Sequence, residues 1–277
     1  MVPLPALVRL TRVWNLLIIG LTQYCTAGLL IDARTVTDPR LLVLAISTMF
    51  IAAGGYSIND YYDIKIDLIN KPDRVVVGKV LSRRTVLALH TFFSLTGVLL
   101  GSLVWWPIGA VNFASAFLLW WYSNALKRLP FIGNFAVAVL SGLAVIVVNV
   151  LYTPFLVTVL IYALFAFFMT IIREIIKDME DLKGDNTFGC RTLPIVWGIR
   201  PTKIFIYFLI TLFAVVVVVI HTSITPLPVT FFAGLLVLPM GVLLAWLVRA
   251  DTRRDFYRLS VFCKLIMLAG IFSMAFI

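Results

Sequence analysis

Nine apolar stretches dominate this chain of 277 residues. They lie at 10–31, 41–58, 85–105, 108–122, 133–150, 153–175, 203–221, 228–248 and 257–277. A helix that crosses a bilayer needs about 20 mostly apolar residues, and only the fourth stretch is clearly short. Charged residues make up 13% of the chain, against roughly 25% in a typical soluble domain. A water-soluble domain could not bury so much apolar surface, so the sequence predicts a polytopic membrane protein.

The distribution of Lys and Arg predicts how these spans are oriented. With the N-terminus in the cytoplasm, 20 of the 23 basic residues fall on the cytoplasmic side. Arg34 and Arg40 fall on the other side, and Lys264 lies inside the last span. Cytoplasmic loops carry such an excess, so we expect a multi-pass protein of the cell membrane with its N-terminus inside and its C-terminus outside. The net charge of +10 then reflects topology and contact with anionic lipid, and it does not indicate nucleic-acid binding.

Acidic residues gather in two long inner loops predicted at about 59–84 and 174–202. Residues 59–67 read NDxxDxxxD, and residues 178–185 read DxxDxxxD. Steps of three and four place the aspartates of each motif on one face of a helix. The motifs follow the second and the sixth span, so four spans separate them. This spacing suggests two halves of the molecule that face each other.

Like charges at this spacing repel, and desolvation near a membrane raises the cost. A cation must compensate, and the natural candidate is Mg²⁺, which binds through one or two carboxylates together with substrate phosphates and water. Bridging Mg²⁺ ions neutralise a diphosphate leaving group. In a membrane the obvious substrate is an allylic prenyl diphosphate, since its C–O bond can ionise to a delocalised cation while its tail lies in an apolar channel.

With these motifs the chain resembles the UbiA superfamily of intramembrane prenyltransferases. The resemblance rests on residues 12–15, 59–67, 70–74 with Gly78, 122–134, and 173–185 with 192–194. The run REIIKDMEDLKGD most resembles the geranylgeranylglyceryl phosphate geranylgeranyltransferases, whereas Val75, Val76 and Val77 depart from the Pro- and Ser-containing pattern usual there. The resemblance implies one all-α domain over 1–277, with nine transmembrane helices around a central cavity and a cytoplasmic cap formed by the two long inner loops.

The resemblance and the charge pattern together predict the site residues. The predicted metal ligands are Asp60, Asp63, Asp67, Asp178, Asp181 and Asp185. The predicted phosphate contacts are Arg74, Lys127, Arg173 and Lys177, because Arg and Lys both bind phosphate oxygens. Cytoplasmic segments carry basic residues in any case, so each of these four also has a plain topological explanation.

Four uncharged side chains complete the predicted site, each with an alternative role. Asn59 either binds metal or orients a carboxylate, or else it caps or packs a helix. Asn15 lies within the first span, where it either lines the cavity or bonds a neighbouring helix. Tyr62 and Tyr122 either place their π-faces beside the allylic cation or are ordinary interfacial tyrosines.

The sequence predicts Mg²⁺-dependent prenyl transfer, and the favoured subfamily implies the hydroxyl of geranylgeranylglyceryl phosphate as the acceptor in ether-lipid synthesis. An aromatic acceptor of the 4-hydroxybenzoate or naphthoate type, as in quinone biosynthesis, and a chlorin or haem remain open alternatives. A divalent-cation transporter is a remote one, because its acidic residues would lie in the middle of the membrane, and these lie at one edge.

Overall fold

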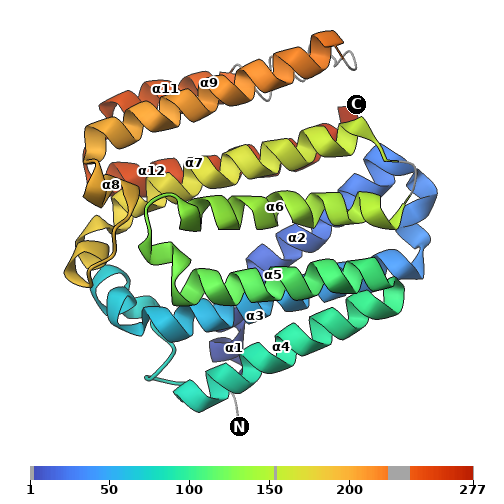
Figure 1. Ribbon diagram of the computed structural model, residues 1–277, viewed down its shortest axis with the longest axis horizontal. Helices are drawn as coiled ribbons and strands as arrows, with labels where there is room; N and C mark the ends of the chain where they lie inside the picture. Colours follow the sequence, from blue (N-terminus) through green and yellow to red (C-terminus); the bar gives the residue numbers. More distant parts are fainter. Residues whose placement is uncertain (1–2, 153–154, 224–237, 277) are drawn as a thin grey trace.

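The computed structural model describes residues 3–152, 155–223 and 238–276, and it describes only the backbone of Arg74. This part of the chain is predominantly helical (Figure 1). The α-helices are α1 (Leu4–Thr11), α2 (Val13–Cys25), α3 (Pro39–Asn70), α4 (Arg83–Val104), α5 (Trp106–Asn124), α6 (Ile132–Leu151), α7 (Val157–Thr187), α8 (Leu193–Val196), α9 (Ile199–Ser223), α11 (Leu238–Arg249) and α12 (Arg253–Ser273).

Short polar segments set where these helices begin. Arg12 adopts a left-handed conformation with φ of 53° and separates α1 from α2. Asp38 caps α3 by accepting a hydrogen bond from the backbone N–H of Arg40, and Pro39 occupies the first turn, where its missing N–H costs nothing. The Arg40 guanidinium binds the same carboxylate, which lowers the pKa of Asp38 below its usual value. Thr252 and Asp255 form a capping box at the start of α12.

Seven helices of the described chain are long and apolar enough to cross a membrane. They are Val13–Ile31, Pro39–Asn70, Arg83–Val104, Ile132–Leu151, Val157–Thr187, Ile199–Ser223 and Arg253–Phe276. The fourth and eighth predicted spans coincide with α5 and with the shorter helix α11. Residues 153–154, 228–237 and 277 of the predicted spans lie outside the described part. The outward faces of these helices carry exposed large apolar side chains, such as Leu103 and Phe117, as a lipid-facing surface requires.

Tight packing between α6, α7, α9 and α12 forms the largest core. The Phe213 ring packs in a tilted geometry against the rings of Phe165 and Phe168, at centroid distances of 6.0 and 5.1 Å. Gly270 of α12 lies directly against the Phe165 ring, and any side chain there would collide with it. This core holds α7, the helix with the second aspartate motif, in a fixed position.

The two aspartate motifs lie on helices, as their spacing predicts, and these helices continue beyond the predicted span ends at positions 58 and 175 into the segments predicted as inner loops. Helix α3 continues through residues 59–67 and ends at Asn70, and α7 continues through residues 178–185 and ends at Thr187. No proline interrupts either motif, so the i→i−4 hydrogen bonds of the apolar span continue into the polar turns. Pro72 and Gly189 follow the two helix ends, and Gly189 has a φ of +70°. Both motif-bearing ends lie at the same end of the bundle, at the left in Figure 1, whereas the C-terminus of the chain lies at the other end.

Candidate active site

The first motif is paired with cations from outside α3. The guanidinium of Arg12 donates a hydrogen bond of 2.8 Å to Asp60 and lies 4.8 Å from the centre of the Tyr56 ring. The ammonium of Lys127, on the 3₁₀ helix Leu126–Arg128, lies 2.5 Å from Asp63. Asp67 is the third member, and its carboxylate forms no hydrogen bond or ion pair with a described residue. Two of the three carboxylates are therefore already balanced by charge.

The second motif is held by residues from two further elements. Asn134 of α6 donates a hydrogen bond of 2.9 Å to Asp178. Lys71, the residue after α3, donates one of 2.7 Å to Oδ2 of Asp181. The other oxygen of Asp181 is buried without a partner in the described chain, and such a buried acceptor is costly unless a ligand satisfies it. Asp185, like Asp67, has no side-chain partner among the described residues.

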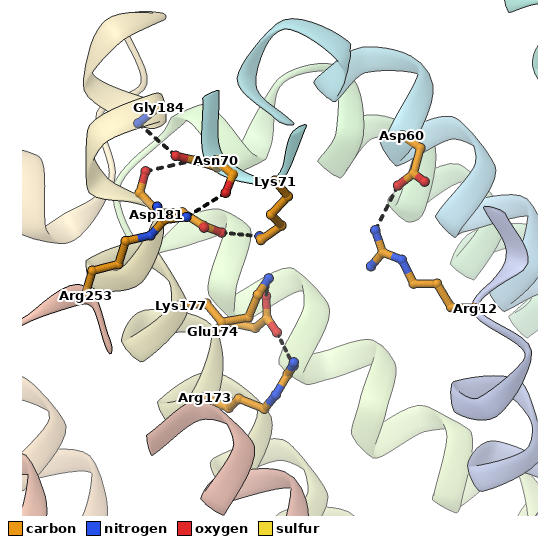
Figure 2. A network of polar contacts seen from close by, with 10 residues as sticks. All are labelled: Arg12, Asp60, Asn70, Lys71, Arg173, Glu174, Lys177, Asp181, Gly184 and Arg253. Atoms are coloured by element: carbon orange, nitrogen blue, oxygen red, sulfur yellow. Dashed lines mark hydrogen bonds and ion pairs between the residues drawn. The ribbon is translucent and has the colours of Figure 1, made fainter. Parts of the chain in front are cut away.

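Asn70 joins the two motif-bearing helices. Its side-chain nitrogen donates to the carbonyl of Asp181, and its side-chain oxygen accepts from the N–H of Gly184, both at 3.1 Å (Figure 2). Arg253 of α12 donates a hydrogen bond of 2.6 Å to the backbone carbonyl of Asn70. A Cβ atom at position 184 would collide with the Asn70 amide, so only glycine permits this approach. The end of α3 is thereby fixed against the turn that carries Asp181.

A charged cluster lies on α7 below the second motif. Arg173 donates a hydrogen bond of 2.6 Å to Glu174, and Lys177 lies 3.7 Å from the other oxygen of the same carboxylate. Figure 2 shows Arg173, Glu174 and Lys177 on one face of the helix, with Lys71 above them and with Arg12 and Asp60 across from them. The structure therefore brings the predicted cations Arg173, Lys177 and Lys127 into the same region as the aspartates.

The uncharged predicted residues lie around this region as well. The amide of Asn15 is 3.4 Å from the hydroxyl of Tyr56, which is a contact between helices α2 and α3. The Tyr62 ring lies 6.0 Å from the ammonium of Lys127. Tyr122, at the end of α5, interacts electrostatically with Asp63, Asp178 and Glu174.

Two predicted residues take part in none of these contacts. Asn59 is half-buried on α3, and its side chain forms no hydrogen bond with a described residue. Arg74 ends the 3₁₀ helix Pro72–Arg74, and its side chain lies outside the described part of the structure.

Four residues that contact the motifs were not predicted as site residues. They are Arg12, Asn70, Lys71 and Asn134. Each lies in a segment on which the family resemblance rests, and this resemblance is the signal that could have identified them as site residues. Their contacts reach 44 to 114 positions along the chain, so spacing within a motif could not reveal them.

The donor set fits a hard divalent cation that is completed by a substrate. Within the described chain no three acidic, His or Cys side chains lie close enough to form a metal cage by themselves. Each motif instead offers separated carboxylate oxygens, including the orphaned Oδ1 of Asp181. Mg²⁺ typically binds in this way, through one or two carboxylates with phosphate and water oxygens as the remaining ligands.

The UbiA prenyltransferase family model matches residues 23–266, most of the chain and both motifs. The chain belongs to the UbiA prenyltransferase family. It is 38% identical over 204 residues to the digeranylgeranylglyceryl phosphate synthase of Methanoculleus marisnigri, a match that covers 73% of this chain and 72% of that one. It is 30% identical over 273 residues to the enzyme of the same name from Thermococcus kodakarensis, covering 94% and 92% of the two chains.

Solved structures agree with this UbiA assignment. A structure described as a digeranylgeranylglyceryl phosphate synthase aligns with a TM-score of 0.74 and 25% identity over 99% of both chains. A UbiA homologue from Archaeoglobus fulgidus, solved with GPP and Mg²⁺, aligns with a TM-score of 0.68 and 14% identity over 98% of this chain and all of that one. The second likeness is one of fold. The chain is therefore an all-α membrane prenyltransferase with the UbiA fold.

Proposed function

We propose that this prenyltransferase transfers a geranylgeranyl group from its diphosphate to the hydroxyl of geranylgeranylglyceryl phosphate, with Mg²⁺ as cofactor. The observation that carries the proposal is a sequence identity of 30% to a relative named digeranylgeranylglyceryl phosphate synthase, in an alignment that covers 94% of this chain. A divalent cation and a prenyl diphosphate donor are supported by the A. fulgidus homologue that was solved with GPP and Mg²⁺. The product is a diether phosphate, a precursor of ether lipids.

The aspartates have the first role in the proposed mechanism. Asp60, Asp63 and Asp67 on α3 and Asp178, Asp181 and Asp185 on α7 hold the metal, with Asn59 as an additional oxygen ligand. When bound, Mg²⁺ neutralises the diphosphate as a leaving group. Lys127 is already paired with Asp63, and Lys71 is paired with Asp181. Arg74, Arg173 and Lys177 add cations for phosphate oxygens.

The second part of the mechanism concerns the allylic carbon. As the C–O bond to the diphosphate breaks, positive charge develops on this carbon, and the acceptor hydroxyl attacks it to form the ether bond. A carboxylate or a phosphate oxygen takes the hydroxyl proton. Tyr62 and Tyr122 place aromatic rings near the developing cation, and Asn15 lines the cavity. The apolar surroundings exclude water, which would otherwise capture the cation.

The proposed topology has nine spans in one domain. Helix α5 and the predicted span at 228–248, of which α11 is the described part, cross the membrane in addition to the seven helices described above. The segments after α3 and α7 cap the cytoplasmic end, the N-terminus lies in the cytoplasm, and the C-terminus lies outside the cell membrane. The excess of Lys and Arg at the motif-bearing end supports this orientation.

An acceptor panel tests the proposed function. Purified protein in nanodiscs receives Mg²⁺ and radiolabelled geranylgeranyl diphosphate, with either geranylgeranylglyceryl phosphate or 4-hydroxybenzoate as the acceptor. We expect a labelled diether phosphate and no labelled aromatic product. A prenylated aromatic product without the diether would contradict the proposed acceptor and leave the prenyl-transfer chemistry in place.

A further inference from the structure

Lys264 is a charged residue inside a membrane-spanning helix. It lies eleven positions after Arg253, the first residue of α12, and thus about 16 Å along the helix. Its neighbours Cys263 and Ile266 are buried against the core, whereas Lys264 itself is accessible. A lysine at such a depth faces a protein interior or a water-filled cavity, because an ammonium in contact with lipid chains is costly.

The packing of α12 on α7 places Lys264 at the level of Arg173. The hydroxyls of Tyr162 and Ser273 lie 2.9 Å apart, and Gly270 lies against Phe165, so the two helices run antiparallel in a fixed register. Lys264 lies six positions before Gly270 on α12, and Ile171 lies six positions after Phe165 on α7. The antiparallel register therefore places Lys264 opposite Ile171. Lys264 thus lies at the level of the turn that begins at position 171 and contains Arg173 and Glu174, and it interacts electrostatically with both.

Cations gather around Glu174 in this part of the molecule. Arg173 and Lys177 share its carboxylate, and Lys264 interacts electrostatically with all three residues. Lys264 forms no ion pair or hydrogen bond with a described side chain, and the Nε atom of Arg173 is buried without a partner in the described chain. These donors would match a phosphate monoester, which carries about −1.5 to −2 charges near neutral pH and three acceptor oxygens.

We propose that Lys264, together with Arg173 and Lys177, forms the pocket that binds the phosphate monoester of the acceptor lipid. This inference rests on the proposed function and assigns a specificity-determining role to α12. Arg173 lies five positions before Asp178, or about 7.5 Å along α7. Only two carbon atoms separate the acceptor hydroxyl from its phosphate ester oxygen. A phosphate held by this pocket therefore keeps the hydroxyl within reach of the allylic carbon of a diphosphate held at the aspartates.

The main test measures binding of the acceptor to the whole protein in nanodiscs, without Mg²⁺ or donor. Wild type, Lys264→Met and Lys264→Arg are each titrated with geranylgeranylglyceryl phosphate and with its dephosphorylated alcohol. We expect Lys264→Met to weaken binding of the phosphate about 10-fold or more and to leave binding of the alcohol unchanged, because a charge-assisted hydrogen bond is lost. Lys264→Arg should retain affinity within a few-fold. Arg258→Met removes a cation from the exposed start of the same helix and should behave as wild type.

Steady-state kinetics separates this inference from the proposed function. Lys264→Met should raise KM for the phosphorylated acceptor about 10-fold and leave KM for the donor within two-fold. If the wild type synthesises the diether, an unchanged KM for the acceptor in Lys264→Met, or a rise in the KM for the donor instead, would overturn the inference. Wild type that forms no diether would contradict the proposed function itself. Size-exclusion profiles verify folding, and Lys264→Gln provides a second neutral variant.

Discussion

The side-chain oxygen of Asn70 accepts a hydrogen bond from the backbone N–H of Gly184 at 3.1 Å. This contact joins the last residue of α3 to the second aspartate motif across 114 positions of sequence. Each motif extends beyond an apolar span, so neither is held by the membrane-spanning packing alone. We conclude that Asn70 positions the two motifs toward each other and acts through Asp181 and Gly184.

Substitution of Asn70 tests this positioning role. Asn70→Ala removes two hydrogen bonds and leaves the N–H of Gly184 buried, so we expect a loss of about 1–3 kcal/mol in the free energy of unfolding. A lower Tm and a fall in kcat with little change in KM for either substrate would show it. Asn124→Ala, at the exposed end of α5, is the matched control and should change neither quantity. A stable, fully active Asn70→Ala variant would refute the positioning role.

Lys71 should compete with the metal for Asp181. Its ammonium lies 2.7 Å from one oxygen of the Asp181 carboxylate. Two unit positive charges about 4 Å apart repel each other by roughly 1–4 kcal/mol, so the ammonium opposes a metal ion bound to the same carboxylate. Lys71→Met should therefore lower the Mg²⁺ concentration for half-maximal activity several-fold. Titration of activity with Mg²⁺ measures this, with Lys65→Met on the exposed face of α3 as the control. A higher Mg²⁺ requirement in Lys71→Met would contradict the competition.

The proposed topology can be tested with single cysteines. In a background with the native cysteines replaced by serine, Arg34→Cys and Lys183→Cys each introduce one exposed thiol. An impermeant maleimide added to intact cells should label the thiol at position 34, and it should label the thiol at position 183 only after lysis. The reverse pattern would invert the proposed orientation.

Cys190 should be unreactive in the folded protein. Burial raises the pKa of its thiol to about 11, with a further contribution from the negative charge of Asp185. Since the thiolate is the reactive form, little of it exists at pH 8. Labelling with iodoacetamide followed by mass spectrometry should be slow in the native state and fast in SDS. Rapid native labelling would show that the segment after α7 opens.

Much of the fold could be predicted from the sequence, because lipid imposes a simple rule on helix length and composition. The helical face shared by Asp60, Asp63 and Asp67 also follows from local spacing alone. The predicted end of the second span at position 58 was too early, because polar residues at positions 59–70 end the apolar run without ending the helix. The contacts of Arg12, Lys71 and Asn134 were not predictable in this way, because they depend on how distant helices pack.

The central claim is that the motifs on α3 and α7 act as one Mg²⁺-dependent site. Single-turnover formation of the diether should be measured for wild type, Asp63→Asn, Asp181→Asn and the double variant, at saturating substrates with Mg²⁺ and with EDTA. We expect a loss of roughly 100-fold or more in each single variant, loss with EDTA, and little further loss in the double variant, because residues that act as a unit are not additive. Full activity in either single variant, or a double variant whose loss equals the product of the two single losses, would contradict the claim.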